Sequence, residues 1–309
     1  MSNLAADSMR VKSVLVATDF SESSERPLRH GVTIARHFGA KLCVAHVVSS
    51  LGFAIAGAQS LALVSEGASG ELRNLERRLL EKGDLSGLSH EFIVREGDVW
   101  QELKSVISEK RVDLIVAGIR GRRDVEKLLL GSVAEQIFRD ADELVLTVGP
   151  HSPDDAPLES LNETSSFVYA TDFTAPSLSA LPHAISFANH FGVRLVFLHV
   201  DPAVPIPESF HWSTAPDIAG MREQARLRAV KNFEEIIQGH EPLSVKPEFI
   251  VEFGQHGEQI LRVARSLKSS LIILGLKHSK HGRALSHLPA TTAYNVVVSA
   301  HCPVLTVRI

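Results

Sequence analysis

The residues with the clearest chemical potential form a glycine-containing segment in the first half of the chain. Gly118-Ile-Arg-Gly121 is followed, after nine further residues, by Gly131-Ser132. Glycines let backbone N–H groups approach an anion without obstruction by a Cβ atom, and the N-terminus of a helix favours phosphate. The spacing therefore predicts a phosphate chain held between the turn at 118–121 and a helix that begins at Ser132, with Arg120 among its charge partners.

Local capping is the alternative explanation of the same residues. Ser132 and Glu135 have the spacing of a capping box, which would satisfy the helix start without any ligand. Asp19 also has two explanations, as an acceptor for ribose or adenine or as a turn residue that caps a helix beginning near Ser21. The ligand-binding interpretation is favoured because open α/β sheets bind ligands at the carboxyl ends of their strands.

The elements that must position these residues occur twice. VLVATDFS at 14–21 returns as VYATDFT at 168–174, so that Asp19 and Asp172 are 172 − 19 = 153 positions apart. HFG at 37–39, HV at 46–47 and VLTV at 145–148 recur at 190–192, 199–200 and 304–307. The chain is therefore a duplicated domain.

Each half alternates short apolar runs with helical patterns. Strands are expected at 13–18, 41–48, 90–96, 113–119 and 144–148, and near 166–171, 194–200, 246–252, 270–275 and 303–308. Helices are expected in the first half at about 22–38, 69–82, 98–110 and 132–140. Nearly continuous apolar strands are typical of a parallel sheet with helices on both faces. The pattern predicts an α/β fold of two tandem repeats, each an open, doubly wound, five-stranded parallel-sheet domain.

Composition gives the boundaries and excludes several classes of protein. The Pro-rich, acidic stretch at 149–163 predicts a linker at 151–163 between domains at 1–150 and 164–309. A net charge of −4 over 309 residues indicates neither a nucleic-acid nor a membrane platform. Cys43 and Cys302 are expected to be buried thiols, and the N-terminus carries no secretory pattern, so a cytoplasmic location is expected.

The motifs from VLVATDFS through the glycine segment to GSVAEQI and VLTV resemble those of the universal stress protein family. The resemblance implies an adenine-nucleotide alpha-hydrolase-like fold and ATP as the ligand, with or without Mg²⁺. Carried over by motif position, it implies that the nucleoside contacts Ala17, Asp19 and Val47. It places the phosphates against Gly118, Arg120, Gly121, Gly131, Ser132 and Val133.

The second half departs from this pattern. After Gly275, His278 stands where the second glycine is expected, and Ala290-Thr291 stands in place of the Gly-Ser pair. Losing glycine where backbone must approach phosphate disfavours binding, so the second site is expected to be empty or weak. The repeated histidines lie on separate elements without a carboxylate or cysteine cluster, and no metal site is expected.

The expected function is a nucleotide-binding protein of stress response or signalling, with the nucleotide held mainly by the first repeat. The alternative is a protein-interaction or chaperone-like module that needs no nucleotide. It would use the apolar segment at 50–65 or the basic, His-rich loop that follows Gly275. No general base is identifiable beside the glycine segment, so slow ATP hydrolysis is the most that is expected of it as an enzyme. The family resemblance implies that the repeats pair through their last strands, and VLTV ends both repeats. The repeats are therefore expected to form an intramolecular pseudo-dimer, with a homodimer or another protein partner left open.

Overall fold

The computed structural model describes residues 11–49, 58–119, 130–149, 158, 161–162, 164–202, 218–240, 242–277 and 291–309. The first repeat comprises β1 (Ser13–Ala17), the 3-10 turn η1 (Glu22–Ser24), α2 (Glu25–Phe38), β2 (Lys41–Ser49), α3 (Ala58–Glu81), β3 (His90–Gly97), α4 (Val99–Lys110), β4 (Leu114–Gly118), α5 (Ser132–Asp140) and β5 (Leu144–Val148). The second comprises β6 (Ser166–Ala170), α6 (Ala175–Ser179), α7 (Leu181–Phe191), β7 (Arg194–Asp201), α8 (Ile218–Ile237), β8 (Glu248–Phe253), α9 (His256–Ser266), β9 (Leu271–Leu276), α10 (Thr292–Ser299) and β10 (Val304–Arg308).

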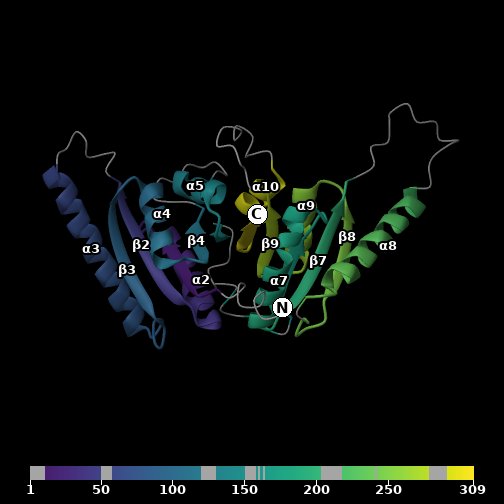
Figure 1. Cartoon of the computed structure of the whole chain (residues 1–309), viewed down its shortest axis with the longest axis horizontal. Coiled ribbons are helices and arrows are strands. Elements are labelled where there is room, and N and C mark those ends of the chain that lie inside the picture. The colour runs from purple at the N-terminus through teal and green to yellow at the C-terminus, as the bar shows by residue number, and fades with distance from the viewer. Residues whose placement is uncertain are drawn as a thin grey trace, which may run out of the picture.

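The strands of both repeats form one continuous sheet, in the order β3-β2-β1-β4-β5-β10-β9-β6-β7-β8. Every neighbouring pair within a repeat is parallel, whereas β5 and β10 are antiparallel. The long helices α3 and α8 lie at the two outer ends of the molecule, and β10 lies near its centre (Figure 1). The predicted fold of two tandem, doubly wound domains is confirmed.

The strands are apolar along nearly their whole length because helices cover both faces of the sheet. On one face, Val14 and Val16 belong to a core that α2, α3, α7 and α8 share across both repeats. On the other face, Leu15 belongs to a separate core beneath α4 and α5. A third core, beneath α5, α9 and α10, includes Phe138 of the first repeat among residues of the second. The two repeats therefore share buried surface on both faces of the sheet.

The central strand pair joins the two repeats. Leu305 of β10 lies opposite Leu146 of β5, and the flanking pairs are Val304 with Thr147 and Thr306 with Val145. The threonines add cross-strand hydrogen bonds, because Thr147 Oγ1 donates to the Val304 carbonyl at 3.2 Å and Thr306 Oγ1 to the Val145 carbonyl at 3.3 Å. The pairing predicted from the repeated VLTV is confirmed, and it covers two strand edges that would otherwise be open.

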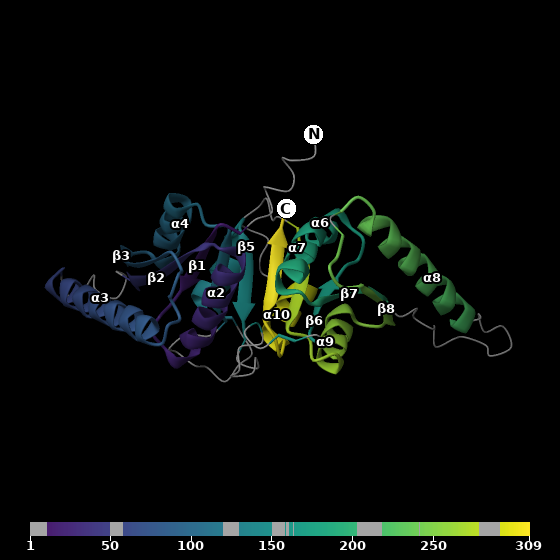
Figure 2. The same ribbon diagram turned by 90° about the horizontal axis from the view of Figure 1, so that it is seen from below.

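A cluster of rings reinforces the junction where α2 and α7 lie side by side (Figure 2). His37 stacks on Phe191 at 4.2 Å between ring centroids, and His190 stacks on Phe38 at 4.1 Å. The two contacts are equivalent, since each pairs the histidine of one repeat with the phenylalanine of the other. The repeated HFG sequence thus serves packing between the repeats.

Two helices differ from their predicted bounds. The helix expected at 69–82 is α3, which begins at Ala58 because the preceding Ala, Gln, Ser and Leu residues continue it despite Gly67 and Gly70. The helix expected at 22–38 is divided into η1 and α2, with Pro27 in the first turn of α2, where a missing N–H costs no helical bond.

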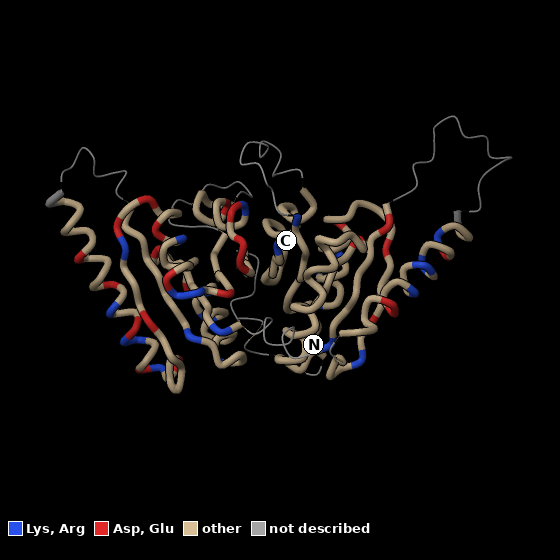
Figure 3. Tube along the Cα trace, viewed as in Figure 1, with Lys and Arg blue, Asp and Glu red and all other residues tan. Residues whose placement is uncertain are grey.

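Charged residues of both signs are interspersed along α3 and α8 (Figure 3). Among the helices described, none combines the length and apolar character that a bilayer span requires. The ion pairs of α3 and α8 include Arg77 with Glu81 and Lys231 with Glu235, at i,i+4 spacing on exposed surfaces. Such pairs contribute little to stability, roughly 0.3–0.5 kcal/mol each.

Folding is expected to weaken in mild acid through His30 of α2. Its side chain is buried, its Nδ1 has no hydrogen-bond partner, and burial together with the nearby Arg29 lowers the pKa of His30 to about 3. The folded state therefore binds fewer protons than the unfolded state below the ordinary pKa of 6.5, so stability falls as pH falls through that window. We expect the free energy of unfolding to drop by about 2 kcal/mol between pH 6.5 and pH 5.

Denaturant unfolding across this range measures the effect, with His30→Leu as the control. The leucine variant removes the titrating group and keeps an apolar side chain, so its stability should vary less with pH. An equal pH dependence in both proteins would show that other groups are responsible.

Candidate functional site

The carboxyl ends of β1 and β4 lie side by side at one edge of the sheet. The two strands are adjacent and parallel, with Val14 opposite Leu114 and Val16 opposite Val116. From β1 the chain proceeds outward to β2, whereas β5 lies on the far side of β4, so the strand order reverses between β1 and β4. This is the switch point at which open α/β sheets bind ligands. Gly118 ends β4 there, and the turn that contains Asp19 follows β1.

Hydrogen bonds from two serines hold Asp19 in a tight turn. Its Oδ1 accepts from the Ser21 backbone N–H at 3.0 Å, and from the hydroxyls of Ser21 and Ser24 at 2.5 Å each. The next residue, Phe20, has a φ of +59°, a left-handed conformation that a phenylalanine rarely adopts. Strained backbone of this kind is concentrated at functional sites. Asp19 therefore stabilises the turn before η1, and its carboxylate is held in a fixed position at the carboxyl end of β1.

His46 supports this turn from β2. Its Nδ1 lies 2.8 Å from the Thr18 carbonyl oxygen, and its ring packs on Phe20 at 4.4 Å between centroids. The same arrangement recurs in the second repeat, where Phe173 has a φ of +61°. There His199 Nδ1 lies 2.9 Å from the Thr171 carbonyl and its ring packs on Phe173 at 4.8 Å. The equivalent positions of His46 and His199 in the two repeats are the sequence signal of this shared role, which no local motif identifies.

Three predicted contact residues lie on the rim of one core. Ala17 of β1, Val47 of β2 and Val133 of α5 are half-buried and pack against the cluster beneath α4 and α5. They come from three elements that share this core, so they offer apolar surface of the kind that a planar ring system can cover.

Helix α5 begins one residue earlier than the capping-box interpretation requires. Gly131 is the N-cap, with φ −62° and ψ 154°, and Ser132 is the first helical residue, with an exposed side chain. The prediction of Ser132 as the cap is therefore wrong. Gly131 has no side chain with which to cap α5, and its own N–H donates to the Ile119 carbonyl at 2.8 Å. This geometry brings the start of α5 close to the end of β4. Arg120 and Gly121 lie outside the described residues.

The helix start in the second repeat is built differently. Thr291, rather than Ala290, precedes α10 as its N-cap, and its Oγ1 accepts from the Tyr294 N–H at 3.2 Å. A side chain of the protein thus satisfies an N–H group that a ligand could otherwise use. The two repeats therefore differ in how the start of the helix after the fourth strand is capped.

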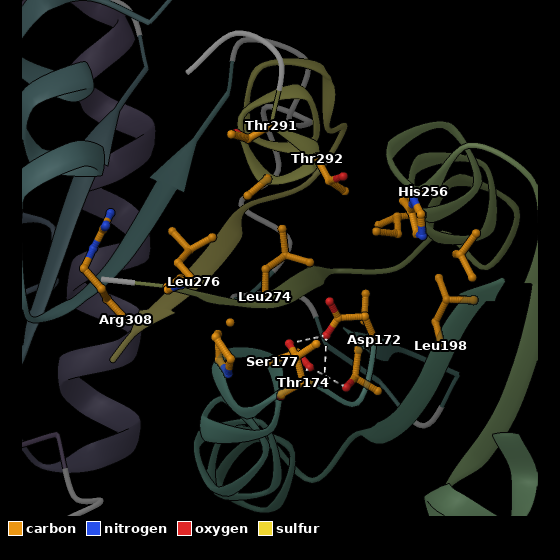
Figure 4. Close-up of a pocket in the computed structure, with 18 of the residues that line it drawn as sticks. Asp172, Thr174, Ser177, Leu198, His256, Leu274, Leu276, Thr291, Thr292 and Arg308 are labelled. Atoms are coloured by element: carbon orange, nitrogen blue, oxygen red, sulfur yellow. Dashed lines mark hydrogen bonds between the residues drawn. The ribbon is translucent and has the colours of Figure 1, made fainter. Parts of the chain in front are cut away.

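A cavity of about 750 Å³ opens at the same edge of the second repeat (Figure 4). Asp172 lies on its wall and accepts hydrogen bonds from the Thr174 N–H at 3.0 Å and the Thr174 hydroxyl at 2.6 Å. Burial raises the pKa of Asp172, but hydrogen bonds from Ser177 and Thr174 outweigh it and hold that pKa below its usual value. Asp172 is therefore a carboxylate at neutral pH.

Comparison with known proteins finds one family. The profile described as Universal stress protein family matches residues 10–149 and again 164–308. Universal stress protein MJ0531 of Methanocaldococcus jannaschii is 30% identical over 138 residues, which is 44% of this chain and 81% of that protein. Universal stress protein YxiE of Bacillus subtilis is 29% identical over 132 residues, 40% of this chain and 89% of that protein.

A solved structure covers both repeats. The crystal structure of a universal stress protein from Archaeoglobus fulgidus DSM 4304 matches with a TM-score of 0.68 and 18% sequence identity, and 97% of each chain is covered. At this identity the likeness concerns the fold, and it extends over the tandem arrangement.

Proposed function

The chain belongs to the universal stress protein family, and from this premise we propose that its first repeat binds an adenine nucleotide, ATP with or without Mg²⁺, in a cytoplasmic stress-response or signalling role. The proposed domains are 1–150 and 164–309, joined by the linker at 151–163. In this proposal Asp19, Ala17 and Val47 contact the nucleoside. Gly118, Gly131, Ser132 and Val133, with Arg120 and Gly121, surround the phosphates.

The contrast between the two helix starts carries the proposal. Thr291 caps α10 with its own hydroxyl, whereas Gly131 leaves the start of α5 without a side-chain cap. The N-terminal N–H groups of a helix carry a partial positive charge and bind phosphate when nothing else occupies them. The preference for the first repeat follows from this difference, because both repeats otherwise keep the aspartate turn and its supporting histidine.

The nucleoside end is supported by the Asp19 turn and the apolar rim. The serines that hold Asp19 Oδ1 fix the carboxylate in place before any ligand arrives, which lowers the entropic cost of binding. Ala17 and Val47 lie on the strands that flank this turn and pack on the core below. An adenine ring needs both features, a flat apolar surface and a fixed hydrogen-bonding group.

Titration calorimetry with ATP should give about one nucleotide per chain, and saturating ATP should raise the melting temperature by mass action. Asp19→Asn removes a carboxylate acceptor and keeps an oxygen that can accept from the Ser21 N–H, so the turn should survive while ATP affinity falls about tenfold. Asp172→Asn is the matched control and should leave ATP affinity unchanged.

Two equivalent sites, or equal losses in the two variants, would contradict the preference for the first repeat. No binding at all would favour the alternative, a protein-interaction module. One observation supports this alternative: α3 has an exposed apolar surface, on which Leu63 is 70% and Val64 45% exposed.

A further inference from the structure

The cavity of the second repeat has walls from both repeats. Most of its lining comes from the second repeat, but Phe138 and Arg139 of α5 in the first repeat also line it. Arg308 of β10 donates a hydrogen bond to the Phe138 carbonyl, which ties this wall to the second repeat. At about 750 Å³ the cavity falls within the usual size of small-molecule sites, roughly 300–1,000 Å³. It is complete only when the repeats are joined.

The middle of the cavity is apolar. Leu198 of β7 and Leu274 of β9 project toward it from the two strands that flank β6, and Leu276 lies between them and Arg308 (Figure 4). Val200 and Ile260 add further aliphatic lining. A bound molecule would therefore gain most of its affinity by removing apolar surface from water.

Arg308 and Lys277 lie at one end of the cavity, and Arg139, a third cation of the lining, is paired with Asp140. Arg308 is opposite Leu276 in the register of β9 and β10, and Lys277 follows Leu276 directly, so both belong to the same corner of the lining. The hydrogen bond of Arg308 goes to a neutral carbonyl, and burial lowers the pKa of Arg308 despite the opposing effect of Asp142 and Asp140. Asp172 lies on the opposite side of the cavity (Figure 4). An anion at the Arg308 corner would compensate charge that is partly removed from water.

We propose that this cavity binds a small molecule with an apolar body and a single anionic group, which lies against Arg308 and Lys277. A polyphosphate chain fits less well, because Thr291 already caps α10 at the helix start that would receive it. The cationic corner is specific to the second repeat: VLTV is followed by Arg308 there and by Gly149 in the first repeat. The proposal does not depend on nucleotide binding by the first repeat.

Two fluorescent probes test the size and polarity of the site. Anilinonaphthalene sulfonate carries an aromatic body and one anionic group, and N-phenylnaphthylamine is nearly the same body without the charge. The full chain should bind both, with the anionic probe about tenfold tighter. Ala293→Trp, on the first turn of α10, fills the cavity and should lower both affinities at least about tenfold.

Asn295→Trp is the matched control, since Asn295 lies on the same helix as Ala293 but is exposed and is not among the lining residues of the cavity. It should leave both probe affinities unchanged. Unchanged binding in Ala293→Trp, or equal losses in Ala293→Trp and Asn295→Trp, would overturn the placement of the site.

Arg308→Gln tests the anionic contact separately from the cavity. Glutamine keeps an N–H donor for the Phe138 carbonyl but removes the charge, so affinity for the sulfonate should fall about tenfold while that for the uncharged probe stays the same. Arg308→Lys keeps the positive charge, so it should retain most of the difference in affinity between the two probes. Equal affinities of the two probes in the unmodified chain, or an unchanged ratio in Arg308→Gln, would overturn the proposal. ATP titrations of the same proteins report on the first repeat and keep the two proposals distinguishable.

Discussion

Gly131→Val is expected to lower ATP affinity at least about 100-fold, which corresponds to roughly 2.8 kcal/mol. Gly131 is the N-cap of α5, and a branched side chain at this position would cover the N–H groups that the proposal assigns to phosphate. Its φ of −62° and ψ of 154° lie in the extended region, where valine is sterically allowed. The substitution should therefore damage the site without breaking the backbone, and calorimetry with ATP measures the loss.

Gly131→Thr is the informative companion, because it copies Thr291 of the second repeat. Threonine and glycine are about equally good N-caps, so folding stability should change little. The hydroxyl would nevertheless compete with phosphate for the same N–H groups, and ATP affinity should fall. If both variants are folded and bind ATP as well as the unmodified chain, the phosphate site is not at the start of α5.

The fold was predictable because its strands are buried on both faces. Runs such as SVLVA at β1 and LIVAG at β4 contain few polar residues, so strand positions and the parallel arrangement follow from the sequence. The central β5–β10 pair followed from the repeated VLTV together with the family resemblance. The start of α3 did not, because Gly67 and Gly70 resemble a boundary although the residues around them favour a helix.

The site was less predictable because its key features depend on distant contacts. The left-handed conformation of Phe20 is stabilised by the Thr18 hydroxyl and by His46, which comes from another strand. The cavity of the second repeat brings Arg308 and α5 together across the junction between repeats. Neither arrangement leaves a local spacing that motif reasoning could detect.

Gly275→Ala is expected to lower the free energy of unfolding by about 3 kcal/mol, as for severe overpacking in a core. Gly275 corresponds to Gly118 at the start of the glycine segment, and its sequence position alone suggests a remnant of a phosphate site. In the structure, a Cβ at Gly275 would lie 1.9 Å from the Pro176 carbonyl oxygen and 2.6 Å from Ser177 Cα. These are backbone atoms of α6, so relief requires the helix to move away from β9.

Gly257→Ala is the matched control for this effect. Gly257 lies in α9, where an added Cβ would meet only Asn295 Cβ at 3.6 Å and the Thr292 carbonyl oxygen at 3.8 Å, both ordinary contacts. Alanine there should stabilise the chain by about 0.4–1 kcal/mol, because it lowers the conformational entropy of the unfolded chain. Thermal or denaturant unfolding of the two variants should therefore move in opposite directions. Equal stabilities would mean that α6 can move away from β9 at no cost in free energy. The expected difference would show that packing against α6 requires Gly275, whether or not a nucleotide binds beside it.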